Sequence, residues 1–169
     1  MTLTAATGRH HFLVALFLLV AMAATVGTAL GFQHIGGFIP CKLCLEQRDP
    51  YYIALPVMLL AVVSAWLRWP GLVTRGLLVA GGLLMTYGLV LAVFHSGVEW
   101  AWWPGPTDCG AAVSAVTQDA GNLLSALDNT RPPSCDQAAG RFLGLSFAGW
   151  NAVASAFLAA IAFRGALAR

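Results

Sequence analysis

The chain has 169 residues, of which 59% are apolar or aromatic and only 9% are charged. Soluble domains usually carry about 25% charged residues, so this composition excludes an ordinary cytosolic enzyme. A net charge of +2 with high hydrophobicity excludes a disordered chain, and nine Lys and Arg without a basic run argue against nucleic-acid binding. What remains is a small membrane protein with several spans.

Four charge-free stretches are long enough to cross a membrane. A helix of about 20 residues spans the hydrocarbon core, and helices are favoured because lipid offers no partner for backbone polar groups. The first stretch could instead be a cleaved signal peptide, but its apolar run is longer than such peptides have. We expect an all-α membrane protein, a single domain over residues 1–169, with spans at about residues 12–32, 51–67, 76–94 and 145–163.

Four spans place both termini on the same side of the membrane. That side carries five basic residues and no acidic one, whereas the other side carries four basic and seven acidic residues. The positive-inside rule counts Lys and Arg, and the five lie in much shorter segments. We therefore expect cytoplasmic termini and two outer loops, residues 33–50 and 95–144.

All four cysteines fall in the outer loops, Cys41 and Cys44 in the first and Cys109 and Cys135 in the second. In a bacterial-type envelope this side is oxidising, so disulfides are expected there. Four cysteines allow three pairings, of which Cys41 with Cys44 is the natural local one. That choice leaves Cys109 with Cys135.

The Cys41–Cys44 spacing suits redox exchange better than structural stabilisation. Its disulfide would close a very small ring and gain little loop-closure entropy, while both sulfurs stay close after reduction. Lys42, Arg48 and the N-terminus of the second span supply positive charge. We expect this charge to stabilise a Cys44 thiolate.

Other functions fit the cysteines less well. We expect no metal, because the second pair lacks the short ligand spacing of a zinc site and an oxidising compartment disfavours stable thiolates. Export of electrons from the cytoplasm needs a cysteine in a span or on the cytoplasmic side, and the sequence has none. A membrane scaffold or transport protein with static disulfides is the non-enzymatic alternative.

These motifs resemble the disulfide bond formation protein B family (DsbB), membrane oxidases that pass electrons from a periplasmic thioredoxin-like oxidant (DsbA) to quinone. Cys-x-x-Cys alone is a weak signal, but Arg48 at a fixed offset and a distant second pair make it specific. A quinone-linked thiol oxidase of the vitamin K epoxide reductase type is a rival, although its Cys-x-x-Cys comes late in the chain. The matching pieces, in order along essentially the whole chain, are Phe32-Gln33-His34, Pro40-Cys41-x-Leu43-Cys44-x-x-Gln47-Arg48, the Trp103–Cys109 stretch, Cys135, Arg141-Phe142-Leu143-Gly144-Leu145 and Trp150.

The resemblance implies a four-helix bundle in the bacterial inner membrane with two redox-active periplasmic loops. The thiolate of a DsbA-like partner would form a mixed disulfide with Cys109, and the freed Cys135 would attack Cys41. Cys44 would then be released as a thiolate beside the quinone, a ubiquinone or menaquinone, which takes two electrons. The catalytic residues implied are therefore Cys41, Cys44, Cys109 and Cys135.

Two residues near the outer face are candidates for binding the quinone. Arg48 could donate hydrogen bonds to a quinone carbonyl, or it could be a headgroup anchor or pair with Glu46 or Asp49. His95 ends the third expected span and could contact quinone, relay a proton or simply cap the helix.

The second outer loop contains two further patterns. Trp100, Trp102 and Trp103 are typical of an aromatic belt at the membrane interface. Apolar residues at spacings of three and four over residues 112–127 predict a short amphipathic helix on the outer leaflet.

Overall fold

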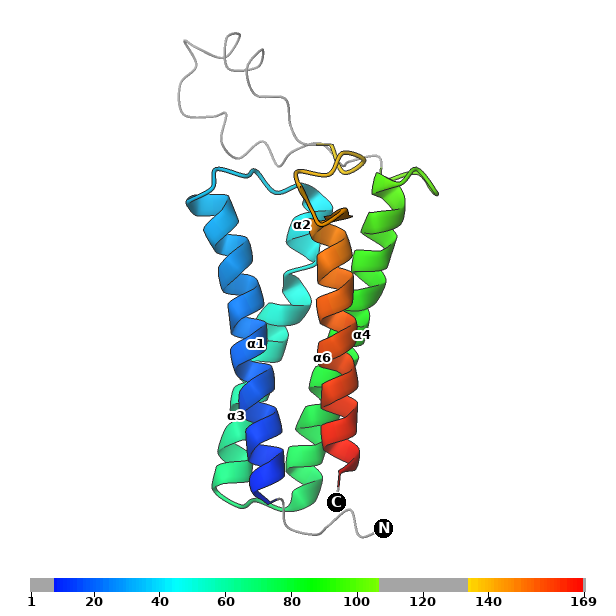
Figure 1. The fold of residues 1–169 in the computed structure, drawn as a ribbon. Helices are drawn as coiled ribbons and strands as arrows, with labels where there is room; N and C mark the ends of the chain where they lie inside the picture. Colours follow the sequence, from blue (N-terminus) through cyan, green and yellow to red (C-terminus); the bar gives the residue numbers. More distant parts are fainter. Residues whose placement is uncertain (1–7, 107–133, 169) are drawn as a thin grey trace.

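The structure, a computed structural model, describes residues 8–106 and 134–168. Four long helices stand side by side in a bundle: α1 (Arg9–His34), α3 (Asp49–Trp66), α4 (Gly71–Glu99) and α6 (Phe147–Leu167). The start of α1 and the end of α6 lie at the same end of the bundle, and the short helix α2 (Lys42–Glu46) lies at the other (Figure 1). This second end, which holds Cys41, Cys44 and Cys135, is called the cysteine end below.

All four long helices of the described residues are apolar enough to cross a membrane. Their most apolar windows have mean hydropathies from 1.4 to 2.4, and α2 with α3 makes one candidate span, Lys42–Trp66. Large apolar side chains such as Phe17, Leu60 and Val90 point outward from the bundle, as lipid-facing residues do. The expected four-span helical bundle is confirmed.

The helices are longer than the charge-free stretches that predicted them. Helix α4 extends five residues beyond residues 76–94 at each end. Arg75 is accommodated because its Nη1 donates a hydrogen bond to the carbonyl of Ala166 on α6, 3.2 Å away. His95, which the sequence placed at the end of a span, is therefore inside α4 and only 2% exposed.

Small residues let the helices of the bundle approach closely. A Cβ on Gly81 would lie 2.4 Å from Met58 Cε of α3, and one on Gly82 would lie 2.9 Å from the ring of Phe163 on α6. Met22, Met58 and Met85 are fully buried where α1, α3 and α4 meet. Close backbone approach of this kind is how membrane helices gain packing energy.

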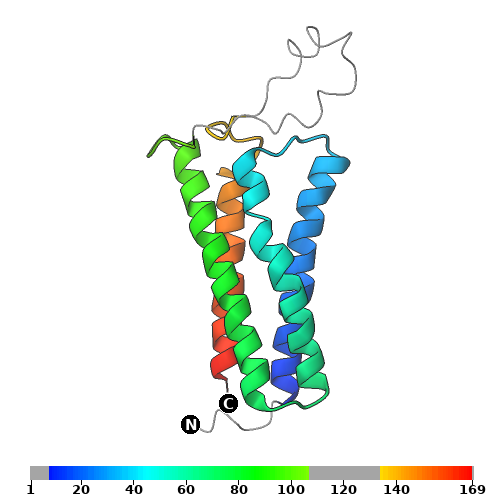
Figure 2. The ribbon, with the colours of Figure 1, turned by 180° about the vertical axis from the view of Figure 1, so that it is seen from behind.

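Seen from behind, α2 continues almost directly into α3, with α1 and α4 on either side (Figure 2). The short helix α2 and the long helix α3 of this span are separated only by Gln47 and Arg48. Pro50 lies in the first turn of α3, where its missing N–H leaves no helical hydrogen bond unmade.

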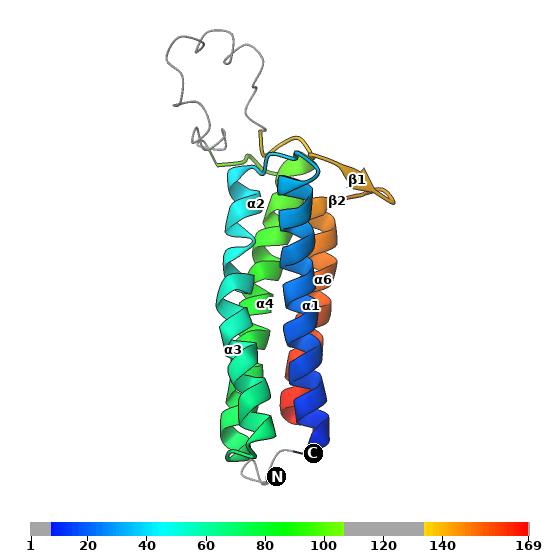
Figure 3. The same cartoon turned by 90° about the vertical axis from the view of Figure 1, so that its left-hand side faces the viewer.

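A short hairpin precedes α6 and projects to one side at the cysteine end (Figure 3). Strands β1 (Arg141–Phe142) and β2 (Leu145–Ser146) pair antiparallel, with Arg141 opposite Ser146. The turn between them needs positive φ angles at Leu143 (50°) and Gly144 (84°). Ser146 then caps α6, its hydroxyl accepting a hydrogen bond from the Gly149 N–H.

Candidate redox site

The Cys-x-x-Cys pair lies at the start of α2. Cys41 is the N-cap residue, and its Sγ lies 3.4 Å from the Cys44 backbone N–H and 3.0 Å from Cys44 Sγ. Both residues are free thiols, Cys41 buried and Cys44 half-buried. The reduced pair therefore keeps its sulfurs together, which is the property that disulfide exchange requires.

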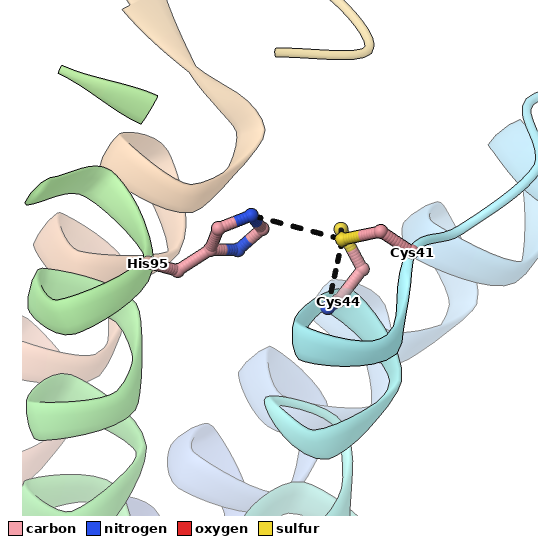
Figure 4. Close-up of side chains that lie close together, drawn as sticks. All are labelled: Cys41, Cys44 and His95. Carbon is pink, nitrogen blue, oxygen red and sulfur yellow. Dashed lines mark hydrogen bonds between the residues drawn. The ribbon is translucent and has the colours of Figure 1, made fainter. Parts of the chain in front are cut away.

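His95 reaches from α4 toward these sulfurs, and its Nε2 lies 3.7 Å from Cys41 Sγ (Figure 4). The hydrogen bond from the Cys44 thiol lowers the pKa of Cys41 to about 4; burial opposes this shift and the contact with His95 adds to it. In the reduced pair the thiolate is thus on Cys41.

The N-terminus of α2 and the His95 imidazole both lie beside Cys41. The sequence predicted instead that Lys42, Arg48 and a helix N-terminus stabilise a Cys44 thiolate. The difference arises because the N-cap residue receives the first N–H groups of a helix. Lys42 forms an ion pair with Glu46 at 3.9 Å, with both side chains about 40% exposed. A Cys44 thiolate belongs to the mixed-disulfide state of the implied route, and it stays a prediction.

Behind the sulfurs, polar side chains from three helices form a chain of hydrogen bonds. Gln47 Nε2 lies 2.6 Å from His95 Nδ1, and Asn151 Nδ2 on α6 donates to Gln47 Oε1 at 2.7 Å. Tyr51 on α3 donates its hydroxyl to Asn151 Oδ1 at 2.8 Å and lies 3.0 Å from the hydroxyl of Ser155. A buried polar chain in an apolar bundle holds its members in a defined arrangement.

Glu99 is a second buried ionisable group beside the pair. Its side chain is 4% exposed, and its Oε1 lies 3.8 Å from His95 Nε2. Its other oxygen makes no hydrogen bond to the described residues. The sequence analysis missed this residue, although its position four residues after His95 places both on one face of a helix.

Cys135 lies in the same buried cluster as Cys41, together with Leu43 and Val98. It is only 1% exposed and is disulfide-bonded. Because Cys41 and Cys44 are free thiols, neither is its partner. Cys109 and the amphipathic helix expected over residues 112–127 lie outside the described residues.

Trp103 packs against this sulfur-containing cluster. Its ring stacks on Phe94 with centroids 6.0 Å apart, and its Nε1 donates to the Phe94 carbonyl at 2.9 Å. Trp100 and Trp102 are more exposed, as residues of an interfacial belt are. Trp103 therefore differs from its neighbours in covering the thiol site.

A cavity of about 470 Å³ lies beside the cysteine pair, between α1, the α2–α3 span and α6. Cys44 and Arg48 line it, whereas Cys41 and His95 do not. Arg48 Nη1 donates to Gln33 Oε1 on α1, 2.5 Å away. Gln33 also lines the cavity. The remaining walls are mainly apolar, and their other polar members are Gln47, Tyr51, Asn151, Thr25 and Thr28.

Cys41 Sγ, Cys44 Sγ and an imidazole nitrogen of His95 lie within 4.8 Å of one another and are possible metal ligands. A ligating nitrogen must present a free lone pair, and the other ring nitrogen then donates its proton. The Gln47 amide nitrogen lies against Nδ1, so Nδ1 is the acceptor and Nε2 carries the proton. This arrangement favours hydrogen bonding to sulfur over metal ligation.

Four membrane helices with a reactive thiol pair at one end define a membrane protein of thiol–disulfide chemistry. The family model for "Disulfide bond formation protein DsbB" matches residues 11–164, and the chain belongs to this family. Disulfide bond formation protein B of Polaromonas sp. strain JS666 is 29% identical over 138 residues, which cover 78% of this chain and 76% of that protein. No solved structure gives a significant match.

Membership of the family confirms the resemblance drawn from the cysteine motifs. The protein is a multi-pass membrane oxidoreductase of disulfide bond formation.

Proposed function

We propose that this protein is a quinone-dependent thiol oxidase that reoxidises a periplasmic thioredoxin-fold oxidant of the DsbA type. The observation that carries the proposal is that Cys44 and Arg48 line one largely apolar cavity. The proposal includes an inner-membrane location with cytoplasmic termini and the cysteine end in the periplasm.

The residues around the cavity fit a quinone. The cavity volume of about 470 Å³ lies in the range of small-molecule sites, and the apolar walls suit a flat ring with a hydrocarbon tail. Phe32, Phe38 and Phe147 form a cluster of ring contacts along these walls, with centroids 5.1–5.9 Å apart. Arg48, held by Gln33, would donate hydrogen bonds to a carbonyl oxygen. A bound quinone would supply an acceptor for two electrons and two protons.

The chain's own residues would carry the electrons in successive exchanges. The partner's dithiol reduces the Cys109–Cys135 disulfide and is itself oxidised to a disulfide. In the second exchange the Cys135 thiolate attacks Cys41, which forms a Cys41–Cys135 bond, breaks the Cys41–Cys44 bond and releases Cys44 as a thiolate at the cavity wall. The Cys109 thiolate would then attack Cys135, which restores the Cys109–Cys135 disulfide, releases Cys41 and leaves the Cys41/Cys44 pair reduced. The shared burial of Cys41 and Cys135 in one cluster supports the second exchange.

His95 has a different place in the proposal from Arg48. It does not line the cavity, and its contacts are with Cys41, Gln47 and Glu99. We therefore assign it to the sulfur side of the site, where it stabilises the Cys41 thiolate, in preference to direct quinone binding.

Turnover with purified protein tests this function. The protein, supplied with a reduced DsbA-like partner and a water-soluble ubiquinone or menaquinone analogue, should consume one quinone for each partner disulfide formed, followed by quinone absorbance. Cys44→Ser should abolish consumption, while Trp66→Ala, at the far end of α3 and 74% exposed, should leave it unchanged. Partner that stays reduced while quinone persists would instead support the static scaffold.

A further inference from the structure

We infer that Asn151 is a positioning residue, which acts through Gln47 to fix the ring proton of His95 on the nitrogen that faces Cys41. Asn151 lies on α6, and its side chain hydrogen-bonds to Tyr51 and Gln47 and to neither described cysteine of the thiol pair. Its effect depends on the direction in which each hydrogen bond of the chain runs.

The direction is set at Tyr51. Its single hydroxyl proton is donated to Asn151 Oδ1 at 2.8 Å, so the hydroxyl of Ser155, 3.0 Å away, is the donor to the Tyr51 oxygen. With its carbonyl engaged by Tyr51, Asn151 turns its Nδ2 toward Gln47 and donates to Oε1 at 2.7 Å.

Gln47 passes this orientation to the histidine. Its carbonyl oxygen is occupied by Asn151, and its amide nitrogen donates to the Leu43 carbonyl at 3.3 Å and faces His95 Nδ1 at 2.6 Å. An amide nitrogen has only protons to offer, so Nδ1 accepts. A neutral imidazole has one donor and one acceptor nitrogen, and the proton is therefore on Nε2.

Nε2–H points to the reactive sulfur. It lies 3.7 Å from Cys41 Sγ and 3.8 Å from Glu99 Oε1, both buried acceptors. In a site with little water a correctly directed N–H contributes more to stabilising a thiolate than it would in solvent. The other tautomer would present a lone pair to that thiolate and repel it.

The positioning matters for the second half of the reaction, and this step rests on the proposed function. Closing the Cys41–Cys44 disulfide from one thiolate and one thiol removes two electrons and one proton, which the quinone takes up with a second proton from solvent. Cys41 must be a thiolate to bond with the Cys44 sulfur. Gln47, Tyr51 and Asn151 also line the cavity, so the acceptor's wall and the ring proton of His95 share the same side chains.

The test is Asn151→Asp, which keeps the shape and removes the donor. An ionised Asp at this position can only accept. At a pH where this carboxyl is ionised, Gln47 must turn its amide nitrogen toward it and its carbonyl toward His95 Nδ1. The ring proton then moves to Nδ1. Nitrogen-15 NMR of reduced, histidine-labelled protein, with the His95 signals assigned by their loss in His95→Gln, should show Nε2 protonated in the parent and Nδ1 protonated in the variant.

Alkylation of Cys41 gives a second readout. Its pH midpoint, measured by peptide mass spectrometry on reduced protein, should rise by about one unit in Asn151→Asp, which lowers the rate below both midpoints about tenfold. The matched control is Thr28→Val. Thr28 lines the same cavity, but its hydroxyl donates to the carbonyl of Ala24 on its own helix and takes no part in the chain that leads to His95. The His95 tautomer and the Cys41 alkylation midpoint of this variant should match those of the parent.

An unchanged Nε2 tautomer in folded Asn151→Asp with the carboxyl ionised overturns the inference, even if the added charge shifts the alkylation midpoint; the ionised state is checked by the carbon-13 shift of the labelled Asp carboxyl. If that variant does not fold, Tyr51→Phe takes its place: it frees the Asn151 carbonyl and should populate both tautomers, and a single Nε2 tautomer there overturns the inference equally. Neither measurement uses quinone or partner. Absence of quinone turnover in the parent would therefore refute the proposed function and leave this result standing.

Discussion

The two cysteines of one short motif have partly different surroundings. Cys41 is 5% exposed and lies against His95 within the cluster that contains Cys135; Cys44 packs against the same cluster but also lines an apolar cavity with Arg48. Although their sulfurs lie 3.0 Å apart, only Cys44 borders the cavity. The difference indicates a division of labour, with exchange between sulfurs on one side and transfer to an acceptor on the other.

The strongest test of this division is to remove the cavity-side sulfur. Cys44→Ser should reduce quinone consumption to background because the sulfur at the cavity wall is gone. The lone Cys41 thiolate of the variant should attack Cys135 of the second pair, which forms a Cys41–Cys135 disulfide and releases Cys109 as a thiolate, because Cys41 and Cys135 share one cluster. Non-reducing peptide mapping of the variant, before any reduced partner is added, detects this bond. Its absence, with Cys135 still exchanging with the partner, would contradict the second exchange.

Replacing Arg48 should separate acceptor binding from sulfur chemistry. Arg48→Met should raise the KM for quinone about 10- to 100-fold, the size expected for losing charge-assisted hydrogen bonds. Arg48→Lys keeps the charge but loses the planar fork, so it should fall between parent and Met. Alkylation of Cys41 should be the same in all three proteins. A parental KM in Arg48→Met would remove Arg48 from the acceptor site.

The pH dependence of Cys41 sharpens the sulfur side. With a pKa near 4 against an ordinary value of 9.0, Cys41 stabilises the reduced form fully above about pH 9; this stabilisation shrinks as the pH falls from 9 and is gone below about 4. Throughout the range above about pH 4 the group itself remains a thiolate. The alkylation rate of Cys41 in reduced protein should therefore be flat from pH 6 to 8. An ordinary thiol would change about tenfold per pH unit over that range. Such a slope at Cys41 would contradict the assignment of the thiolate.

The smallest expected effect comes from the tryptophan that covers the sulfur cluster. Trp103→Ala should lower thermal stability and speed alkylation of Cys41 several-fold, because its ring packs on Phe94 and on the buried cluster. The loss should stay below the about 3–5 kcal/mol of a fully buried tryptophan. Trp102→Ala, at a residue 63% exposed, is the matched control and should change neither quantity.

The fold was predictable because it depends on a property that can be read along the chain, the length of each charge-free stretch. Charge-free length determines where a chain can cross lipid, so four spans followed directly from the sequence. The ends of the spans did not follow from the sequence, because the bundle accommodates two charged residues within α4. Arg75 donates to the Ala166 carbonyl, and Glu99 lies beside the buried His95. Charge marks the limit of a span only when no other helix provides a partner.

The sequence singled out Cys41, Cys44 and Arg48 as candidates because they share one local motif, and their roles stay predictions. The hydrogen-bond chain could not be predicted, because Tyr51 is 100 residues from Asn151 and 104 from Ser155, and it meets them only when α3 packs on α6. An isolated asparagine or tyrosine in an apolar stretch carries no sequence signal of its partner. For the same reason the sequence placed His95 at a helix end, where its burial and its contact with Cys41 were not visible.

The nearly continuous α2–α3 span has a mechanical consequence. Cys44 and Arg48 are carried by the same length of backbone, only four residues apart, while the facing wall of the cavity belongs to α1 and α6. A movement of α1 or α6 would widen or narrow the cavity for a hydrophobic ligand without changing the separation of Cys44 and Arg48 along the backbone. Covalent connectivity thus fixes these two lining residues relative to each other, while the width of the cavity depends on how the helices pack.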